Sequence, residues 1–244
     1  MQRFKITIEY DGTNYCGWQM QDNGISIQQT MQEIMQSFFN QQIKLYASGR
    51  TDSGVHAVGQ VAHFDCETKM TPYSIKKAIN ILLPKDIKIV QCERATDTFN
   101  ARYDAKIKTY CYWIYNAEEN SPLRENRAYF CKTPLDVEAM KIATKYFLGE
   151  HDFVGFRSAH SCAESTVRQI YSFDIEQKGC DVFLTITGNG FLYNMVRIIA
   201  GTLLQVGLGK TKAEEIGAII ASHERKCAGK TLSACGLYLK RVEY

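Results

Sequence analysis

The chain has 244 residues, of which 45% are hydrophobic and 23% are charged, and its formal net charge is +3. These values are ordinary for a globular protein, and the length suffices for one large domain or two moderate ones. The mildly basic balance permits an anionic partner but does not establish one. No segment resembles a signal or transit peptide, and no uncharged apolar run is long enough to span a bilayer. The sequence therefore predicts a cytoplasmic protein without a membrane partner.

Residues in the first part of the chain alternate between apolar and polar in some segments and follow a helical period in others. The predicted elements are a strand at 3–10, a helix at 27–39, strands at 44–47 and 58–65, a helix beginning at Pro72 and a strand at 87–94. This β-α-β-β-α-β order is that of a ferredoxin-like half.

The second part repeats the same order with insertions. Its predicted elements are a strand at 106–116, a helix at 136–147, strands at 166–176 and 181–187, helices at 191–206 and 212–222, and a strand at 236–242. No flexible linker separates the two parts. We therefore expect an α+β fold with two ferredoxin-like halves, residues 1–103 and 104–244, that form a central antiparallel sheet flanked by helices.

Nine cysteines are scattered along the chain, and none forms a Cys-x-x-Cys pair. Buried free thiols in a reducing compartment are the simpler interpretation. His160 and Cys162 lie close together, but two ligands without a second pair are a weak indication of a metal. We expect no metal site.

The segment Gly49–His56, "GRTDSGVH", places one carboxylate, Asp52, between glycines and beside Arg50. An aspartate before a glycine is usually a turn residue that bonds its own backbone. Here an arginine can hold the carboxylate ionised, and the flanking strands can aim it. An ionised carboxylate can act as a nucleophile or a base, and the absence of a second acid argues against simple glycoside hydrolysis. We predict that Asp52 is a reactive group, with His56 positioning a loop or contacting a phosphate.

Two further segments contain candidate functional residues. Tyr110 shares a predicted strand face with Lys106 and Lys108, an arrangement that suits either sheet packing or stacking on an unpaired RNA base. Arg197 interrupts an otherwise apolar helix, and a buried arginine needs an anionic partner. That partner can be Asp52, or it can be a structural acid such as Asp152 or Glu150.

Five segments together resemble the TruA family of tRNA pseudouridine synthases, in the order found in that family. They are "GRTDSGVHA", "FNARYDA" at 99–105, "HDFVGF" at 151–156, "GNGFLYNMVRIIAGTLLQVGLGK" at 188–210 and "GLYL" at 236–239. The resemblance covers essentially the whole chain and implies the pseudouridine synthase fold. It also implies a homodimer with its surface on the second half, and a basic cleft that receives tRNA.

The resemblance implies an isomerase that converts uridine to pseudouridine at positions 38, 39 and 40 of the tRNA anticodon stem-loop, with no cofactor. It assigns Asp52 as the catalytic carboxylate, Tyr110 as the ring that stacks on uracil, Arg197 as the partner of Asp52, and Arg50 as a base-flipping residue. The substrate-binding residues it implies are Tyr110, His56, Asn100, Arg102, Lys108 and Leu192.

The chain departs from the family pattern at three places: Asn100, Lys108 and the pair Leu232-Ser233. None of these removes a predicted catalytic group, but they leave room for a different RNA target. The alternatives are therefore the same isomerase acting on ribosomal RNA, and a non-catalytic RNA-binding protein on the same scaffold. The sequence does not decide whether Asp52 attacks C1′, attacks uracil C6 or removes a sugar proton, nor whether Tyr110 or Asp52 takes the C5 proton.

Overall fold

The computed structural model describes residues 1–22, 24–158 and 164–244. It divides into two units, the first made of residues 1–106 and 239–244 and the second of residues 107–238. The chain therefore leaves the first unit at Lys106 and returns to it at Leu239. The last six residues, 239–244, belong to the first unit. The division into functional halves at 1–103 and 104–244 stays a prediction.

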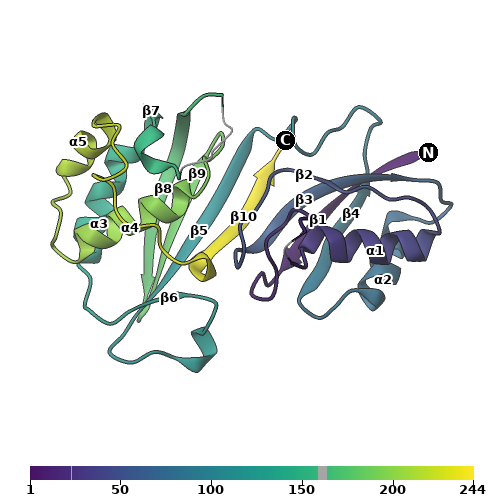
Figure 1. The fold of residues 1–244 in the computed structure, drawn as a ribbon, viewed down its shortest axis with the longest axis horizontal. Helices are drawn as coiled ribbons and strands as arrows, with labels where there is room; N and C mark the ends of the chain where they lie inside the picture. The colour runs from purple at the N-terminus through teal and green to yellow at the C-terminus, as the bar shows by residue number, and fades with distance from the viewer. Residues whose placement is uncertain (23, 159–163) are drawn as a thin grey trace. The chain divides into compact units, whose positions relative to one another are not determined.

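The first unit contains the predicted β-α-β-β-α-β order (Figure 1). Its elements are β1 (Gln2–Tyr10), α1 (Ile27–Phe39), β2 (Tyr46–Ala47), β3 (His56–Cys66), α2 (Pro72–Leu82) and β4 (Ile87–Arg94). β1 pairs antiparallel with both β3 and β4, and β2 pairs antiparallel with β3. The strand order β4-β1-β3-β2 is the ferredoxin-like one, and β10 (Leu237–Glu243) also pairs with β3.

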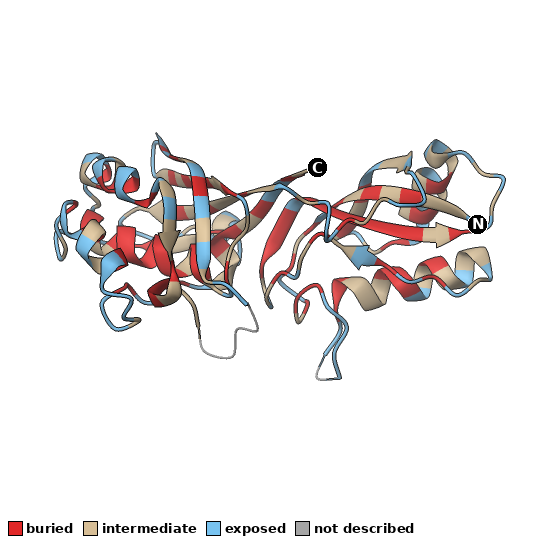
Figure 2. Cartoon of the chain, turned by 90° about the horizontal axis from the view of Figure 1, so that it is seen from above, coloured by how far each residue is buried: buried red, intermediate tan, exposed pale blue. Residues whose placement is uncertain are grey.

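Local sequence explains where the two helices of the first unit begin. The Ser26 hydroxyl accepts a hydrogen bond from the Gln29 amide, and Thr71 does the same for Ser74 ahead of Pro72. Such caps satisfy amides that the first helical turn leaves unpaired. Figure 2 shows buried residues along the helices and the strands. In the first unit, the fully buried apolar residues of the two helices and of strands β1 and β3 include Ile27, Met31, Met35, Ile75, Ile79, Phe4, Ile6 and Phe64.

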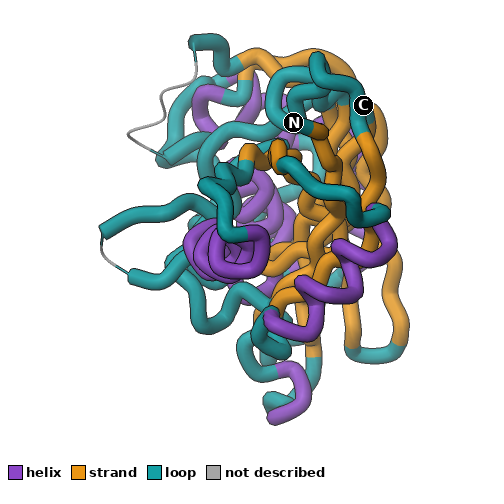
Figure 3. Tube along the Cα trace, turned by 90° about the vertical axis from the view of Figure 1, so that its right-hand side faces the viewer, coloured by secondary structure: helices purple, strands orange, loops and turns teal. Residues whose placement is uncertain are grey.

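The second unit is built on a sheet in the order β5-β9-β8-β7, with antiparallel neighbours, and β6 adds to β5 in parallel. Its elements are β5 (Ile107–Asn116), β6 (Tyr129–Cys131), α3 (Val137–Thr144), β7 (Gly149–Asp152), β8 (Val167–Lys178), β9 (Asp181–Gly188), α4 (Met195–Gly207) and α5 (Glu215–Ala221). Figure 3 distinguishes these strands and helices from the long loops that connect them. The α+β fold class is confirmed.

The structure differs from the predicted elements in several places, among them the helix predicted at 212–222, which is α5 at Glu215–Ala221. The strands β6 and β7 were not predicted, because they are only three and four residues long. The helix predicted at 136–147 is α3 followed by a 3-10 turn at Lys145–Phe147. The helix predicted at 191–206 begins only at Met195, because Asn194 adopts a left-handed conformation with φ of 62°. No helix within residues 1–22, 24–158 and 164–244 is long and apolar enough to cross a membrane.

Candidate functional site

Asp52 occupies the first position of a tight turn directly before β3. The Val55 amide donates to the Asp52 carbonyl at 3.1 Å, and Gly54 at the third position has a φ of 75°. A positive φ at that position favours glycine. The turn leaves the Asp52 side chain half-buried. The motif thus holds a carboxylate at a defined point beside the sheet.

A buried hydrogen-bond network supports the segment that leads into this turn. Gln60 has no exposed surface; its Oε1 accepts from the Ser48 hydroxyl at 2.7 Å, and its Nε2 donates to the Gly49 carbonyl at 3.0 Å. The Tyr10 and Thr51 hydroxyls share a hydrogen bond of 2.8 Å. Burial raises the pKa of Tyr10 well above its ordinary value, so this phenol stays neutral. The network fixes the backbone on the N-terminal side of Asp52.

The chain between β1 and α1 supports the same turn from a second direction. The Trp18 amide donates to the Thr51 carbonyl at 3.0 Å, and the Ser53 hydroxyl donates to the Tyr15 carbonyl at 3.2 Å. A Cβ on Gly17 would lie 2.5 Å from the Thr51 carbonyl oxygen, so only glycine permits this approach. Contacts from two directions thus hold the turn that carries Asp52 in place.

Arg50 lies between two residues that belong to the buried network. The Gly49 carbonyl accepts from Gln60, the Thr51 hydroxyl is bonded to Tyr10, and Arg50 itself is exposed. Contact between Arg50 and Asp52 stays a prediction, as does the role of Arg50 in base flipping.

His56 is buried at the start of β3 and anchors the turn after β1. Its Nδ1 accepts a hydrogen bond from the Gly12 amide at 3.1 Å, and a carboxylate oxygen of Asp11 lies 3.1 Å from the same nitrogen. Of the two roles predicted for His56, this contact fits the positioning of a loop.

Asn100 and Arg102 lie on the loop that follows β4. The Asn100 side-chain oxygen accepts from the amides of Arg102 and Tyr103 at 2.9 and 3.2 Å, which closes a turn, and Arg102 itself is exposed. The Ala101 amide donates to His63 Nδ1 at 3.1 Å. His63 is seven residues beyond His56 on β3, or about 23 Å along an extended strand. These two predicted RNA-binding residues therefore lie near the other end of β3 from Asp52.

Tyr110 and Lys108 lie on β5 of the second unit. Tyr110 pairs with Ile186 and Lys108 with Gly188 on β9, and the Tyr110 ring meets the edge of Phe191 with centroids 5.2 Å apart. Both side chains keep part of their surface exposed, whereas Leu192 is buried. The structure thus places Tyr110, Lys108 and the Phe191–Leu192 segment around one end of β9.

Arg197 is half-buried on the first turn of α4, and its guanidinium contacts Leu232 and Asn194. Its Nε donates to the Leu232 carbonyl and its Nη1 donates to the Asn194 side-chain oxygen, both at 2.7 Å. The Asn194 amide in turn donates to the Ser158 hydroxyl at 2.9 Å. Sequence reasoning missed Asn194, although its position three residues before Arg197 at a helix start was a usable signal.

Of the two structural acids considered as partners of Arg197, Asp152 has other partners and Glu150 is exposed. The Asp152 carboxylate accepts from the Val154 amide at 3.0 Å and lies 3.8 Å from His223, and the Thr166 hydroxyl lowers its pKa. No ion pair joins Arg197 to Asp152 or Glu150 among the described residues. Pairing of Arg197 with Asp52 stays a prediction.

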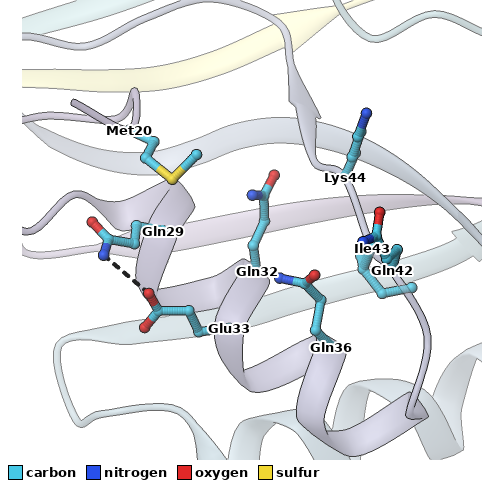
Figure 4. Close-up of a pocket in the computed structure, with 8 residues that line it drawn as sticks. All are labelled: Met20, Gln29, Gln32, Glu33, Gln36, Gln42, Ile43 and Lys44. Carbon is cyan, nitrogen blue, oxygen red and sulfur yellow. Dashed lines mark hydrogen bonds between the residues drawn. The ribbon is translucent and has the colours of Figure 1, made fainter. Parts of the chain in front are cut away.

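Other features add little to the candidate site. Within the described ranges, no group of three or more His, Cys, Asp or Glu side chains could hold a metal ion; His160 and Cys162 lie outside those ranges. A polar recess of about 260 Å³ lies beside α1, where the Gln29 amide donates to Glu33 at 3.0 Å (Figure 4). No predicted site residue lines it. It is lined by Met20, Gln29, Gln32, Glu33, Gln36, Gln42, Ile43 and Lys44.

Comparison with known proteins identifies the family. The family model described as tRNA pseudouridine synthase matches residues 6–104 and 143–244. Proteins named tRNA pseudouridine synthase A from Ruminiclostridium cellulolyticum and Acetivibrio thermocellus are 45% and 46% identical to this chain, over 100% of both sequences in each case. A protein named tRNA pseudouridine synthase A 2 from Clostridium perfringens is 46% identical over the same full coverage.

Among solved structures, a Cbf5-Nop10-Gar1 complex aligns with 96% of this chain and 57% of its own at 15% identity, and its TM-score of 0.37 is too low to support an argument. The sequence matches are much stronger evidence than this structural match, because they run the full length of the chain and include the segment around Asp52. They confirm the family resemblance and, with it, the pseudouridine synthase fold. The chain belongs to the tRNA pseudouridine synthase family and is a pseudouridine-forming isomerase.

Proposed function

We propose that this chain converts uridine to pseudouridine in tRNA, at positions 38, 39 and 40 of the anticodon stem-loop, with Asp52 as the catalytic carboxylate and without a cofactor. The observation that carries the proposal is the rigid turn that holds Asp52, found in a chain whose full-length relatives are named tRNA pseudouridine synthases.

The reaction is an isomerisation that needs no oxidant or reductant. The N1–C1′ bond breaks, the uracil rotates and a C5–C1′ bond forms; N1 gains a proton and C5 loses its hydrogen. Asp52 can attack C1′, attack C6 or remove a sugar proton, and all three routes need an ionised carboxylate at a fixed place. The C5 proton goes to Tyr110 or to Asp52.

Residues from both units are assigned to this reaction. A target base stacked in a stem must be extruded at a cost of roughly a few kcal/mol, and the Tyr110 ring can recover part of that cost by stacking. Arg197 supplies a cation whose orientation is set by Asn194 and Leu232. Lys108, Arg102 and the exposed Arg50 are assigned to contacts with the RNA.

The direct test is release of tritium from unmodified tRNA labelled at uracil C5. Wild type should release tritium, whereas Asp52→Asn should release none although it folds and binds tRNA. The matched control is Asp97→Asn, because Asp97 is an exposed aspartate of the same unit. A normal rate for Asp52→Asn would refute the catalytic assignment.

The same assay separates the alternative functions. Transcripts with a single uridine at position 38, 39 or 40 should each be modified. If no tRNA is modified but ribosomal RNA is, the chemistry stands and the substrate assignment falls. If neither RNA releases tritium while both bind, the chain is an RNA-binding protein on this scaffold.

We also propose that the chain forms a homodimer through its second half. Sedimentation equilibrium at micromolar concentration should give twice the mass of 27.8 kDa. A single-chain mass under the conditions of the activity assay would contradict the proposal.

A further inference from the structure

Residues 224–232, which we call the strap, cross α4 one turn beyond Arg197. At the crossing, a Cβ on Gly201 would lie 1.9 Å from the Lys230 carbonyl oxygen, and a Cβ on Gly229 would lie 2.4 Å from the Gly201 carbonyl carbon. Real Cβ atoms essentially never approach closer than 3.0 Å. Two glycines therefore let the backbones of the strap and the helix touch directly.

Hydrogen bonds lock the crossing. Thr202, which has no exposed surface, accepts from the Gly229 amide at 2.8 Å and donates to the Ile198 carbonyl at 2.9 Å. Within the strap, the Arg225 guanidinium donates to the Gly229 carbonyl at 2.8 Å and to the Thr231 hydroxyl at 3.1 Å. Hydrogen bonds within the strap thus brace it, and the bond from Gly229 to Thr202 ties it to α4 at the crossing.

The end of the strap meets Arg197 at two points. The Leu232 carbonyl accepts from Arg197 Nε at 2.7 Å, and the Leu232 amide donates to the Arg197 carbonyl at 3.3 Å. Four residues of helix separate Arg197 from Gly201, or about 6 Å along the axis. A displacement of the strap at Gly201 must therefore move the carbonyl that holds the guanidinium.

We propose that the strap is a positioning element for Arg197, with the Gly201–Gly229 contact as its fixed point. The inference rests on the proposed function, in which Arg197 acts at the reacting nucleotide, and it assigns a role to residues that do not touch the substrate. Gly201, Thr202, Gly229 and Leu232 act by holding the guanidinium in the orientation that the reaction uses.

The test replaces Gly201 with alanine, which forces the Lys230 carbonyl to retreat by about 1 Å, from 1.9 to 3.0 Å. A misplacement of this size can lower a rate by about 100-fold, so we expect Gly201→Ala to lower kcat by about 10- to 100-fold with little change in KM for tRNA. The control is Gly217→Ala in α5, where a Cβ would lie at an ordinary 3.6 Å from the Tyr146 ring. It should keep the wild-type kcat.

A double-mutant cycle separates positioning from a general loss of structure. In an Arg197→Ala background, Gly201→Ala should have no further effect on kcat, because there is no guanidinium left to misplace. An equal loss in both backgrounds, or a normal rate for Arg197→Ala in an active enzyme, would overturn the proposal. Thr202→Val, which removes the bond to Gly229 and keeps the side-chain shape, is the milder variant should Gly201→Ala fail to fold.

A second readout does not depend on activity. Nuclear magnetic resonance of the Arg197 side chain should show slow hydrogen exchange at Nε in wild type and in Gly217→Ala, and at least 10-fold faster exchange in Gly201→Ala. Unchanged exchange would overturn the positioning role even if the enzyme is active. If Gly201→Ala shows the faster exchange but the wild-type protein releases no tritium from tRNA, the positioning role of the strap is upheld and the proposed function is refuted.

Discussion

Gln60 is the side chain on which the segment before Asp52 depends most. Both ends of its amide are used, by Ser48 and by Gly49, and it has no contact with solvent. Replacement by leucine leaves these groups buried without partners, which costs about 1–3 kcal/mol each. We expect Gln60→Leu to lose about 2–4 kcal/mol of unfolding free energy in urea and most of the turnover.

The control for this substitution is Gln177→Leu, because the exposed Gln177 bonds only the Gly179 carbonyl, at 3.2 Å. It should change stability by less than about 0.5 kcal/mol. Equal stability of the two variants would show that the buried network does not support the turn.

His63 gives the first unit a pH dependence. Burial lowers its pKa, and its Nδ1 accepts from the Ala101 amide, so the folded state holds the ring neutral. The unfolded chain takes up a proton below about pH 6.5, so the contribution of this residue is complete above that pH and declines as the pH falls. We expect His63→Gln to flatten the loss of unfolding free energy between pH 7 and pH 5.5, by at most about 1.4 kcal/mol per pH unit.

Urea denaturation of both proteins at the two pH values measures this difference. Because the chain has four other histidines, the comparison is between slopes and not between absolute stabilities. Parallel slopes for wild type and His63→Gln would contradict the prediction.

Sequence reasoning found the residues whose type is unusual for their surroundings. Asp52 stands out between glycines, and Arg197 stands out within an apolar helix. Gln60 has no such unusual surroundings, because its role comes from partners distant in the chain, and the only signal for Asn194 was its spacing from Arg197 at a helix start. A contact between Arg50 and Asp52 was expected from their proximity in the sequence and stays a prediction; the structure shows that Arg50 is exposed.

At the scale of elements, the approach of the β1–α1 connection to the Asp52 turn depends on Gly17. Its φ is 99°, and a Cβ would meet the Thr51 carbonyl at 2.5 Å. Gly17→Ala should therefore cost more than about 2 kcal/mol, since backbone strain of about 1–2 kcal/mol is joined by the displacement of the turn, and should also lower kcat. Unfolding and tritium-release measurements test both parts.

Gly209 offers the matched comparison, because its φ is 68° and a Cβ there would meet nothing within 4 Å. Gly209→Ala should cost about 1–2 kcal/mol from backbone strain and leave kcat unchanged. If the two variants lose turnover equally, the close contact at Thr51 is not what holds the turn.

Elements with clear periodicity were predictable, and short ones were not. The strand at 87–94 was predicted with its observed bounds, and α1 and α2 follow from capping residues and apolar stripes. β6 and β7 are too short to show a period, and they exist because β5 and β8 offer them an edge. Pairing between distant segments decides such strands, and local sequence does not record it.

At the scale of the whole molecule, binding of tRNA should depend steeply on salt. A net charge of +3 is small, so affinity must come from cations placed along the RNA rather than from the total. The logarithm of the binding constant should fall linearly with the logarithm of salt concentration, and Lys108→Gln should reduce the slope by about 0.7–0.9.

Filter binding at several potassium chloride concentrations measures these slopes. Lys178→Gln serves as the control, since Lys178 is exposed beside the β8–β9 turn and pairs with Glu176. Binding that is independent of salt would refute a phosphate-tracking surface, and equal slopes for all three proteins would remove Lys108 from it.

The first unit is interrupted in sequence by the whole of the second. Residues 239–244 complete it: the Glu243 carbonyl accepts from the Lys106 amide at 2.9 Å, and the Tyr244 ring lies against Phe99 and beneath the Lys5 ammonium. During synthesis on the ribosome these residues emerge after the second unit has been made, so the unit that carries Asp52 waits for the other to be translated. A nascent chain that stops before residue 239 lacks the segment that completes the first unit, so we expect the sheet beside Asp52 to be finished only after the second unit has been translated.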